Sequence, residues 1–464
     1  MSLQLFDLSA PPAPAQETVL AQPSFGRDPT NSPEAWDWIF CIAILVAFGV
    51  LLYCSFYTSL FRPLWLAAEN HRWGHLLIRP SILWTMVGST LFVFRTVLWF
   101  RYRPFRSSSF VEAPSLTVVI PAYNEGAMVM QSIKSVAEAL YPSDRLEVFV
   151  VDDGSTDDTW SYIKRAATQH PGIVRTIRLP QNQGKRAALA AGFKRARGEV
   201  IVTLDSDSAI DPDALLAISG PFRDEKVGAV AGKVTVYNRK RGIIPRMLHV
   251  QYILSFDLLR AVESSYGTVY CCPGALTAYR SSVLRKALDQ WMRQTFLGSP
   301  CTYGEDRAMT NLILASGYNT VYQRTAQVRT VVPEKYRQLC RMFLRWDRSY
   351  VREEIRFMSI VWKRPLLARL IALWDRSVTN LRFPLNTGCM VLLAALVVGK
   401  PLMIFRILTA IGLVSLVNMA YYLRSERSKD FVYGICFSYF SFFTMFWIFP
   451  YAVLTVRARS WLTR

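Results

Sequence analysis

The chain has 464 residues, of which 52% are hydrophobic and 19% are charged, and its formal net charge is +20. This composition is more apolar than that of a typical soluble protein, and the charge favours phosphorylated substrates and anionic lipid surfaces as partners. No zinc-finger, homeodomain or RNA-recognition spacing is present, so nucleic acid is not expected as a partner. None of the eight cysteines forms a CxxC pair, which indicates reduced, structural thiols in a cytosol-facing protein.

The N-terminal region combines a polar tail with two apolar segments. Residues 1–35 are rich in proline, alanine and polar residues and lack a basic stretch directly before an apolar core, so we expect a disordered tail rather than a cleaved signal peptide. Within residues 36–106, the segments 38–61 and 81–100 are long and apolar, and Arg95 interrupts the second. Because a span needs about 20 residues, both are predicted to cross the membrane.

Residues 107–355 have the sequence pattern of an α/β domain. The runs "LTVVI", "EVFVV" and "EVIVTL" are expected strands, and helical stretches at 128–140, from about residue 156 and at 184–198 alternate with them. Strands alternating with helices imply a parallel, doubly wound sheet, in which a ligand lies outside the carboxyl ends of the strands. The polar clusters "PAYNE", "DDGS" and "DSDS" all fall at such ends. Three clusters in register predict one binding crevice.

These clusters suggest specific chemistry. Asp205 and Asp207, two residues apart on an extended chain, place two carboxylates on one face, which suits Mg²⁺ or Mn²⁺ beside a substrate phosphate. Asp153 either accepts hydrogen bonds from a nucleotide base or ribose, or caps the helix near Thr156. Lys185 follows a glycine at a helix start, where it either binds an anion or is an ordinary surface lysine.

Downstream, "YGEDRAMT" places Glu305 and Asp306 next to Arg307. Such a group is commonly a structural ion pair, but after a predicted phosphate and metal site one of the two carboxylates could serve as a general base.

Arginines then recur at spacings of three or four, which predicts one helical stripe that faces solvent or lipid headgroups: Arg337, Arg341, Arg345, Arg348, Arg352 and Arg356. Trp346 falls off this stripe, where it either packs in the core or stacks on a sugar ring.

The C-terminal third returns to apolar sequence. Residues 356–382 are expected to be amphipathic and interfacial, and three apolar segments follow at 383–399, 407–423 and 431–456. Three full spans would put the C-terminus outside, whereas the tail at 457–464 is basic and therefore expected inside. We therefore predict that the segment 431–456, which is aromatic and contains Pro450, lies at the interface instead of spanning.

Together, "IPAYNE", "VVDDGSTDDT", "LDSDS", "GEDR" and "LRWDRS" resemble the motifs of the family 2 inverting glycosyltransferases of GT-A fold. The resemblance extends from about residue 115 to 464, includes "CCPGALTAYR", and is strongest to hyaluronan synthases and the rhizobial chitooligosaccharide synthase. It implies a GT-A domain inserted between N- and C-terminal membrane helices, a multi-pass protein of the plasma membrane, and a cytosolic catalytic domain.

The resemblance also implies residue roles. The uridine pocket would be lined by Tyr123, Glu125, Asp153 and Lys185. A Mg²⁺ or Mn²⁺ ion would be held against the donor diphosphate by Asp205 and Asp207. Asp306 would deprotonate the acceptor hydroxyl, Arg345 would contact the diphosphate, and Trp346 would stack under the acceptor sugar. The implied reaction converts an α-linked donor into a β-linked product.

Two departures concern processivity. Met342 stands where processive members carry glutamine or arginine, and Leu462 replaces a glycine in the closing motif, which is expected to act as a gating segment. The resemblance further implies that a complete channel takes a second copy, so a homo-oligomer is expected. Three functions follow: a processive synthase using UDP-N-acetylglucosamine, alone or with UDP-glucuronate, or using UDP-glucose; transfer of one sugar to a lipid acceptor; and a non-catalytic sensor, which the intact motifs disfavour.

Overall fold

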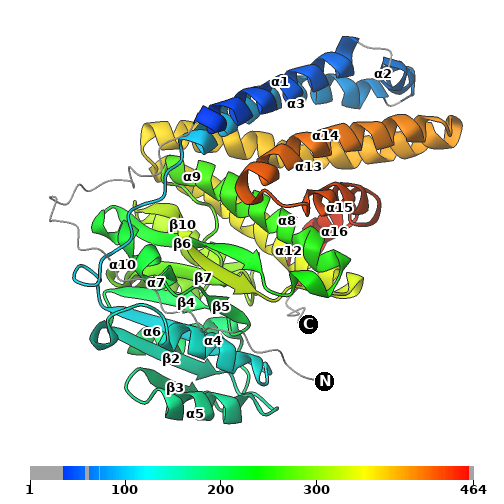
Figure 1. The fold of residues 1–464 in the computed structure, drawn as a ribbon. Coiled ribbons are helices and arrows are strands. Elements are labelled where there is room, and N and C mark those ends of the chain that lie inside the picture. Colours follow the sequence, from blue (N-terminus) through cyan, green and yellow to red (C-terminus); the bar gives the residue numbers. More distant parts are fainter. Residues whose placement is uncertain (1–34, 58–61, 73, 459–464) are drawn as a thin grey trace.

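The computed structural model describes residues 35–57, 62–72 and 74–458 (Figure 1). The predicted disordered tail at 1–35 lies outside these residues except for its last position. Most of the predicted gating segment at 457–464, with Leu462, also lies outside them.

The core of the α/β domain is an eight-stranded sheet in the order β3-β2-β1-β4-β7-β6-β10-β5. The first four strands are mutually parallel, which confirms the prediction for β1, β2 and β4: β1 (Leu116–Ala122), β2 (Leu146–Asp152), β3 (Val174–Arg178) and β4 (Val200–Leu204). The expectation of a parallel sheet fails beyond β4, because β7 pairs antiparallel with both β4 and β6, and β5 pairs antiparallel with β10. The remaining strands are β5 (Ser208–Ile210), β6 (Val227–Val236), β7 (Leu276–Arg280) and β10 (Asn319–Thr330), and β8 (Thr295–Phe296) pairs with β9 (Ser299–Pro300) outside the sheet.

Helices cover the sheet and make its central strands fully buried. Every residue of β1 is buried, as the continuous β-branched run "LTVVI" requires of a strand covered on both faces. Close packing depends on Gly192, where a Cβ atom would overlap Val119 of β1. The helices of this layer are α4 (Met128–Ala137), α5 (Thr159–Gln169), α6 (Lys185–Arg195), α7 (Ala214–Ser219), α10 (Ser281–Met292) and α11 (Glu305–Ala315).

A second group of helices lies between the sheet and the apolar helices (Figure 1). Helix α8 (Ile243–Ile253) continues through a π-helical turn, Leu254–Arg260, into α9 (Ala261–Ser265). Such turns are rare and frequently occur at functional sites. Helix α12 (Tyr336–Ile360) carries the predicted arginine stripe.

The N- and C-terminal helices lie on the side of the domain away from β3, and the longest of them extend beyond it (Figure 1). They are α1 (Ala35–Tyr57), α2 (Arg62–Glu69), α3 (Gly74–Arg101), α13 (Leu366–Gly399), α14 (Met403–Glu426), α15 (Phe431–Thr444) and α16 (Ile448–Leu454). Within the described residues, three helices are long and apolar enough to cross a membrane, namely α3, α13 and α14, and a bent pair, α15 with α16, would make a fourth.

Three membrane predictions are refined by these bounds. Helix α1 is apolar over Asp37–Tyr53, and residues 58–61 of the expected first span lie outside the described residues. Helix α13 runs unbroken across the predicted boundary at 382/383. The segment 431–456 bends by 51° before Pro450, which lies in the first turn of α16, where proline is tolerated. Its interfacial placement remains a prediction.

Candidate active site

Hydrogen bonds connect the loop after β1 to the segment after β2. The backbone N–H of Asn124 donates to Ser155 Oγ at 3.0 Å, and the N–H groups of Glu125 and Gly126 both donate to Thr159 Oγ1 at 2.8 Å. Asn124 has φ 53°, a left-handed conformation that asparagine tolerates better than most residues. This arrangement holds the loop that contains Tyr123 and Glu125 at the carboxyl end of the sheet.

Asp153 organises the entry to α6. Its side chain is buried, and its two carboxylate oxygens accept the backbone N–H groups of Gln183 and Gly184, each at 2.8 Å. Burial raises the pKa of this carboxyl group, although these two hydrogen bonds oppose the rise. The alternative interpretation, that Asp153 caps the next helix, is wrong, because α5 begins at Thr159 and Asp153 contacts the turn before Lys185.

Lys185 lies between two carboxylates. Its Nζ atom is 2.5 Å from Oδ1 of Asp205 and 3.0 Å from Oε1 of Glu305. Burial disfavours its charge, but the two carboxylates outweigh that effect and raise its pKa. Burial likewise opposes the charge of Glu305, yet the Lys185 ammonium lowers the pKa of that carboxyl group. Lys185 is therefore not a surface lysine. Besides its predicted place in the nucleotide pocket, it contacts Asp205, a predicted metal ligand.

Two hydroxyl groups hydrogen-bond to the Asp207 carboxylate. Its Oδ1 atom accepts hydrogen bonds from Ser208 Oγ and Thr330 Oγ1, both at 3.2 Å. No group of three or more histidine, cysteine, aspartate or glutamate side chains that could hold a metal ion occurs among the described residues. Asp205 and Asp207 nevertheless supply hard oxygen ligands, which fit Mg²⁺ or Mn²⁺ if phosphate and water complete the coordination shell.

Asp306, at the start of α11, is enclosed at the end of the same site. Its Oδ1 atom accepts the backbone N–H of Arg307 at 2.7 Å, and the Cys271 thiol lies 3.7 Å from its Oδ2 atom. Burial, followed by the adjacent Glu305 carboxylate, raises the pKa of Asp306. A carboxylate with a raised pKa is suited to accept a proton near neutral pH.

A cavity of about 1250 Å³ connects this site to the apolar helices. Six of the predicted site residues line it: Lys185, Asp205, Asp207, Asp306, Arg345 and Trp346. The other three lie on the loops after β1 and β2 and do not line it: Tyr123, Glu125 and Asp153. The far wall comes from helices α1, α3, α13 and α14, with Phe48, Trp84, Val378 and Val414.

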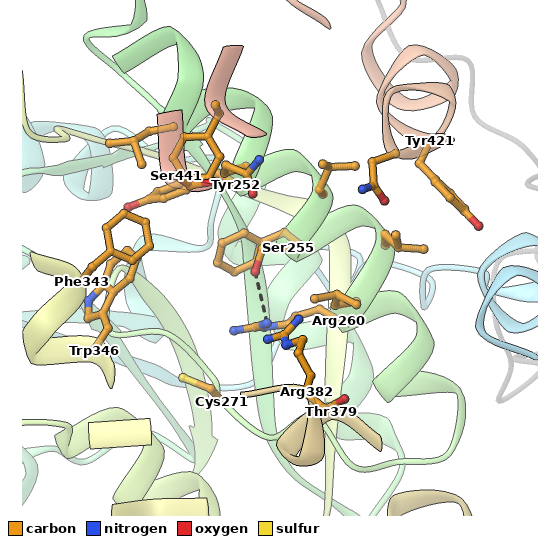
Figure 2. A pocket seen from close by; sticks show the side chains of 18 of the residues that line it. Tyr252, Ser255, Arg260, Cys271, Phe343, Trp346, Thr379, Arg382, Tyr421 and Ser441 are labelled. Atoms are coloured by element: carbon orange, nitrogen blue, oxygen red, sulfur yellow. Dashed lines mark hydrogen bonds between the residues drawn. The ribbon is translucent and has the colours of Figure 1, made fainter. Parts of the chain in front are cut away.

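Trp346 forms an aromatic corner of this cavity, where Figure 2 shows it beside Phe343. Its ring centroid is 5.5 Å from that of Phe343 and 6.2 Å from that of Tyr252. The side chain keeps 38% of its surface exposed, so it is not a core residue. An exposed indole face with aromatic support is suited to stacking on a sugar ring.

The predicted exposed arginine stripe is wrong for two of its members. Arg348 and Arg352 are both buried, but by different neighbours: Arg348 lies against Tyr451 of α16, and Arg352 lies against Tyr303. The Arg348 guanidinium donates to Thr455 Oγ1 at 2.9 and 3.0 Å, and Arg352 pairs with Glu353 at 3.1 Å. Periodicity within one helix could not reveal this burial, since the residues that cover the two arginines lie in other segments of the chain.

Some lining residues were not predicted. Gly274, within "CCPGALTAYR", lies against the ion pair, and a Cβ atom there would be 2.8 Å from Lys185 Nζ. Three further residues line the cavity: Tyr252, Arg260 and Arg382. The sequence pattern around each of them is that of an ordinary helix. Of these residues, only Gly274 could have been noticed from the sequence, because it lies in the motif "CCPGALTAYR".

The mixed sheet, with acidic side chains after the carboxyl ends of its parallel strands, defines a GT-A-like α/β glycosyltransferase domain. Residues 117–288 match the family described as Glycosyl transferase family 2. The chain belongs to this family.

Among its relatives, the hyaluronan synthase of Streptococcus pyogenes is 34% identical over 290 residues, covering 61% of this chain and 67% of that one. The N-acetylglucosaminyltransferase of Rhizobium sp. (strain N33) is 31% identical over 366 residues, covering 76% and 77%. Among solved structures, the mannosyltransferase PcManGT from Pyrobaculum calidifontis, in complex with GDP-Man and Mn²⁺, matches with a TM-score of 0.46 and 22% identity, covering 74% of this chain and 97% of that one.

Proposed function

We propose that this family 2 glycosyltransferase is a membrane-integrated, inverting enzyme that uses a UDP-sugar, with UDP-N-acetylglucosamine the first candidate, to extend a β-linked polysaccharide or oligosaccharide. The observation that carries the proposal is the cavity, in which the carboxylates of the sheet edge, the Arg345–Trp346 pair and the apolar helices line one continuous space. The named activities of the relatives support the sugar class.

The donor would bind across the carboxyl ends of the parallel strands. The uridine would lie over the loops after β1 and β2, near Tyr123, Glu125 and Asp153, which are adjacent to β4 through the β2-β1-β4 order. The diphosphate would then point toward Asp205 at the end of β4. Arg345 would meet the diphosphate from α12, and its charge would stabilise the negative charge that develops on the departing UDP.

Asp205 and Asp207 would hold a Mg²⁺ or Mn²⁺ ion, which when bound supplies positive charge to the diphosphate. Lys185 already contacts one oxygen of Asp205, so its ammonium contributes a second, permanent positive charge at this position.

The acceptor would approach from the opposite side, with its terminal sugar stacked on Trp346. Asp306 would take the proton of the acceptor hydroxyl while that oxygen forms a bond to the anomeric carbon. The bond between the anomeric carbon and the phosphate oxygen breaks at the same time, and UDP leaves with the electron pair. Attack from the face opposite the leaving group inverts an α-linked donor into a β-linked product.

The product would leave through the part of the cavity that the helices surround. On this path the catalytic domain would lie in the cytosol, where UDP-sugars are made, and the helices in the plasma membrane. Transfer of a single sugar to a lipid acceptor is the second candidate, since Met342, buried and lining the cavity, stands where processive relatives carry a polar side chain. Product length separates the two, because a single-sugar glycolipid contradicts the processive reaction.

The test is UDP release by the purified full-length protein across UDP-N-acetylglucosamine, UDP-glucuronate and UDP-glucose, singly and in pairs. Asp306→Asn is the matched control, because it keeps the size of the side chain and removes the base. At least one donor should give UDP release well above this variant. If none does, the catalytic proposal fails.

A further inference from the structure

Charged side chains line the cavity on two sides, and Lys185, Arg307 and Arg345 lie among the carboxylates of the first side. The carboxylates of Asp205, Asp207, Glu305 and Asp306 gather at the edge of the sheet. Arginines occupy the side toward the helices: Arg95 on α3, Arg260 at the end of the π-helical turn and Arg382 on α13. Only the carboxylate end is used by the proposed donor and metal.

Arg260 and Arg382 differ from Arg95 in their ionic partners. Arg95 is neutralised, since its guanidinium lies 2.7 Å from Asp375 and donates to Thr379 Oγ1 at 2.9 Å. Among the residues that the structure describes, neither Arg260 nor Arg382 has a carboxylate at ion-pair distance. Arg260 donates to Ser255 Oγ at 3.3 Å, whereas its Nε atom is buried without a hydrogen-bond partner.

The two guanidinium groups share one part of the cavity. Figure 2 shows Arg260 and Arg382 extending into it from different elements, close to Cys271. Cys271 in turn lies 3.7 Å from the Asp306 carboxylate. Both guanidinium groups would attract an anion in this part of the cavity, because charges interact more strongly in a partly apolar enclosure than in water. Guanidinium forks are well matched to carboxylate and phosphate oxygens.

We propose that Arg260 and Arg382 form a binding site for an oxyanion carried by the acceptor, either the carboxylate of a uronic acid unit or the phosphate of a lipid-linked sugar. The inference rests on the proposed glycosyl transfer and narrows its acceptor class. The site lies beside Asp306 on the helix side of the cavity, so it contacts the acceptor and not the donor diphosphate. A neutral oligosaccharide would offer neither guanidinium group a charged partner.

The test is direct binding to the full-length protein carrying Asp306→Asn, which prevents turnover. Three probes are titrated: a neutral tetrasaccharide of N-acetylglucosamine, a tetrasaccharide in which glucuronate alternates with N-acetylglucosamine, and N-acetylglucosamine linked to a polyprenyl phosphate. We expect one anionic probe to bind about tenfold or more tightly than the neutral one, as two charge-assisted contacts would give. The uronate or the phosphate probe, whichever binds, identifies the source of the oxyanion.

Variants separate charge from folding. Arg382→Gln and Arg260→Gln should each abolish the preference for the anionic probe, whereas Arg382→Lys should keep part of it. Arg369→Gln is the matched control on α13, since Arg369 stacks on Trp362 and does not line the cavity. Equal affinity of all three probes, or equal weakening of all three by Arg382→Gln, would overturn the inference. Failure of the proposed function is seen separately, as absent UDP release in the protein with Asp306 intact.

Discussion

The ammonium of Lys185 lies 2.5 Å from a carboxylate oxygen of Asp205. This contact joins the start of α6 to the end of β4, and the contact to Glu305 extends it to the start of α11. One lysine thus fixes the relative positions of three segments that the proposed chemistry needs, and it occupies one of the oxygens that a metal ion would use.

Gly274→Ala should disturb this contact. The added Cβ atom would lie 2.8 Å from Lys185 Nζ and 3.3 Å from Asp205 Oδ1, so the ammonium must move. We expect a loss of about tenfold or more in kcat/KM for UDP release, with little change in thermal unfolding. Gly172→Ala is the control, because the methyl group added there would have no neighbouring atom within 4 Å. Equal activity of the two variants would contradict a role for the Lys185 position.

The acid limb of the pH–rate profile should depend on Glu305. A base acts when deprotonated, and the raised pKa of Asp306 means that activity is lost on acidification at a higher pH than for an ordinary aspartate, whose pKa is about 3.9. Glu305→Gln removes the neighbouring negative charge, so the Asp306 pKa should fall and the limb should move to lower pH. The measurement is kcat/KM against pH for both proteins, and an unmoved or upward-shifted limb would argue against Asp306 as the base.

Trp346→Ala should weaken acceptor binding more than donor binding. Loss of an aromatic platform raises the acceptor KM by about five- to tenfold if a sugar stacks there, and Trp346→Phe should retain part of the affinity. Trp447→Ala is a matched control, since Trp447 is 39% exposed, close to the 38% of Trp346, and lies outside the cavity lining. An effect on the donor KM alone would assign Trp346 to the other substrate.

Arg352→Met should destabilise the fold. The Arg352 guanidinium is buried, pairs with Glu353 at 3.1 Å and donates to the Tyr303 carbonyl. Removing it leaves a buried carboxylate short of one partner, a change that costs about 3–5 kcal/mol of unfolding free energy. Thermal unfolding in detergent measures the effect against Arg337→Met, because Arg337 is exposed on the same helix. Similar midpoints for both variants would show that the contacts of Arg352 with Glu353 and Tyr303 do not stabilise the fold.

The parallel half of the fold could be predicted because its signals are local. Continuous apolar runs predicted β1, β2 and β4, and the polar residues that follow them predicted where the site lies. Asp205 and Asp207 follow from this reasoning, because they come directly after β4 at the carboxyl end of the parallel strands.

The rest depends on contacts between distant segments. The antiparallel insertion of β7 is set by the path of the chain through α8 and α9, which no local pattern encodes. The burial of Arg348 depends on α16 and on Thr455 just after it, which lies 107 residues further along the chain. Tyr123, on the loop after β1, does not line the cavity, which motif order alone could not reveal.

The cavity walls extend in sequence from Phe48 on α1 to Ser441 on α15. A ribosome delivers these segments in order, and domains can fold as they emerge. The sheet with Asp205 and Asp306 is therefore complete well before the last wall of the chamber has been translated. Assembly of the enclosed space must wait for the final helices, so the proposed sugar transfer would begin only once the whole chain has been made.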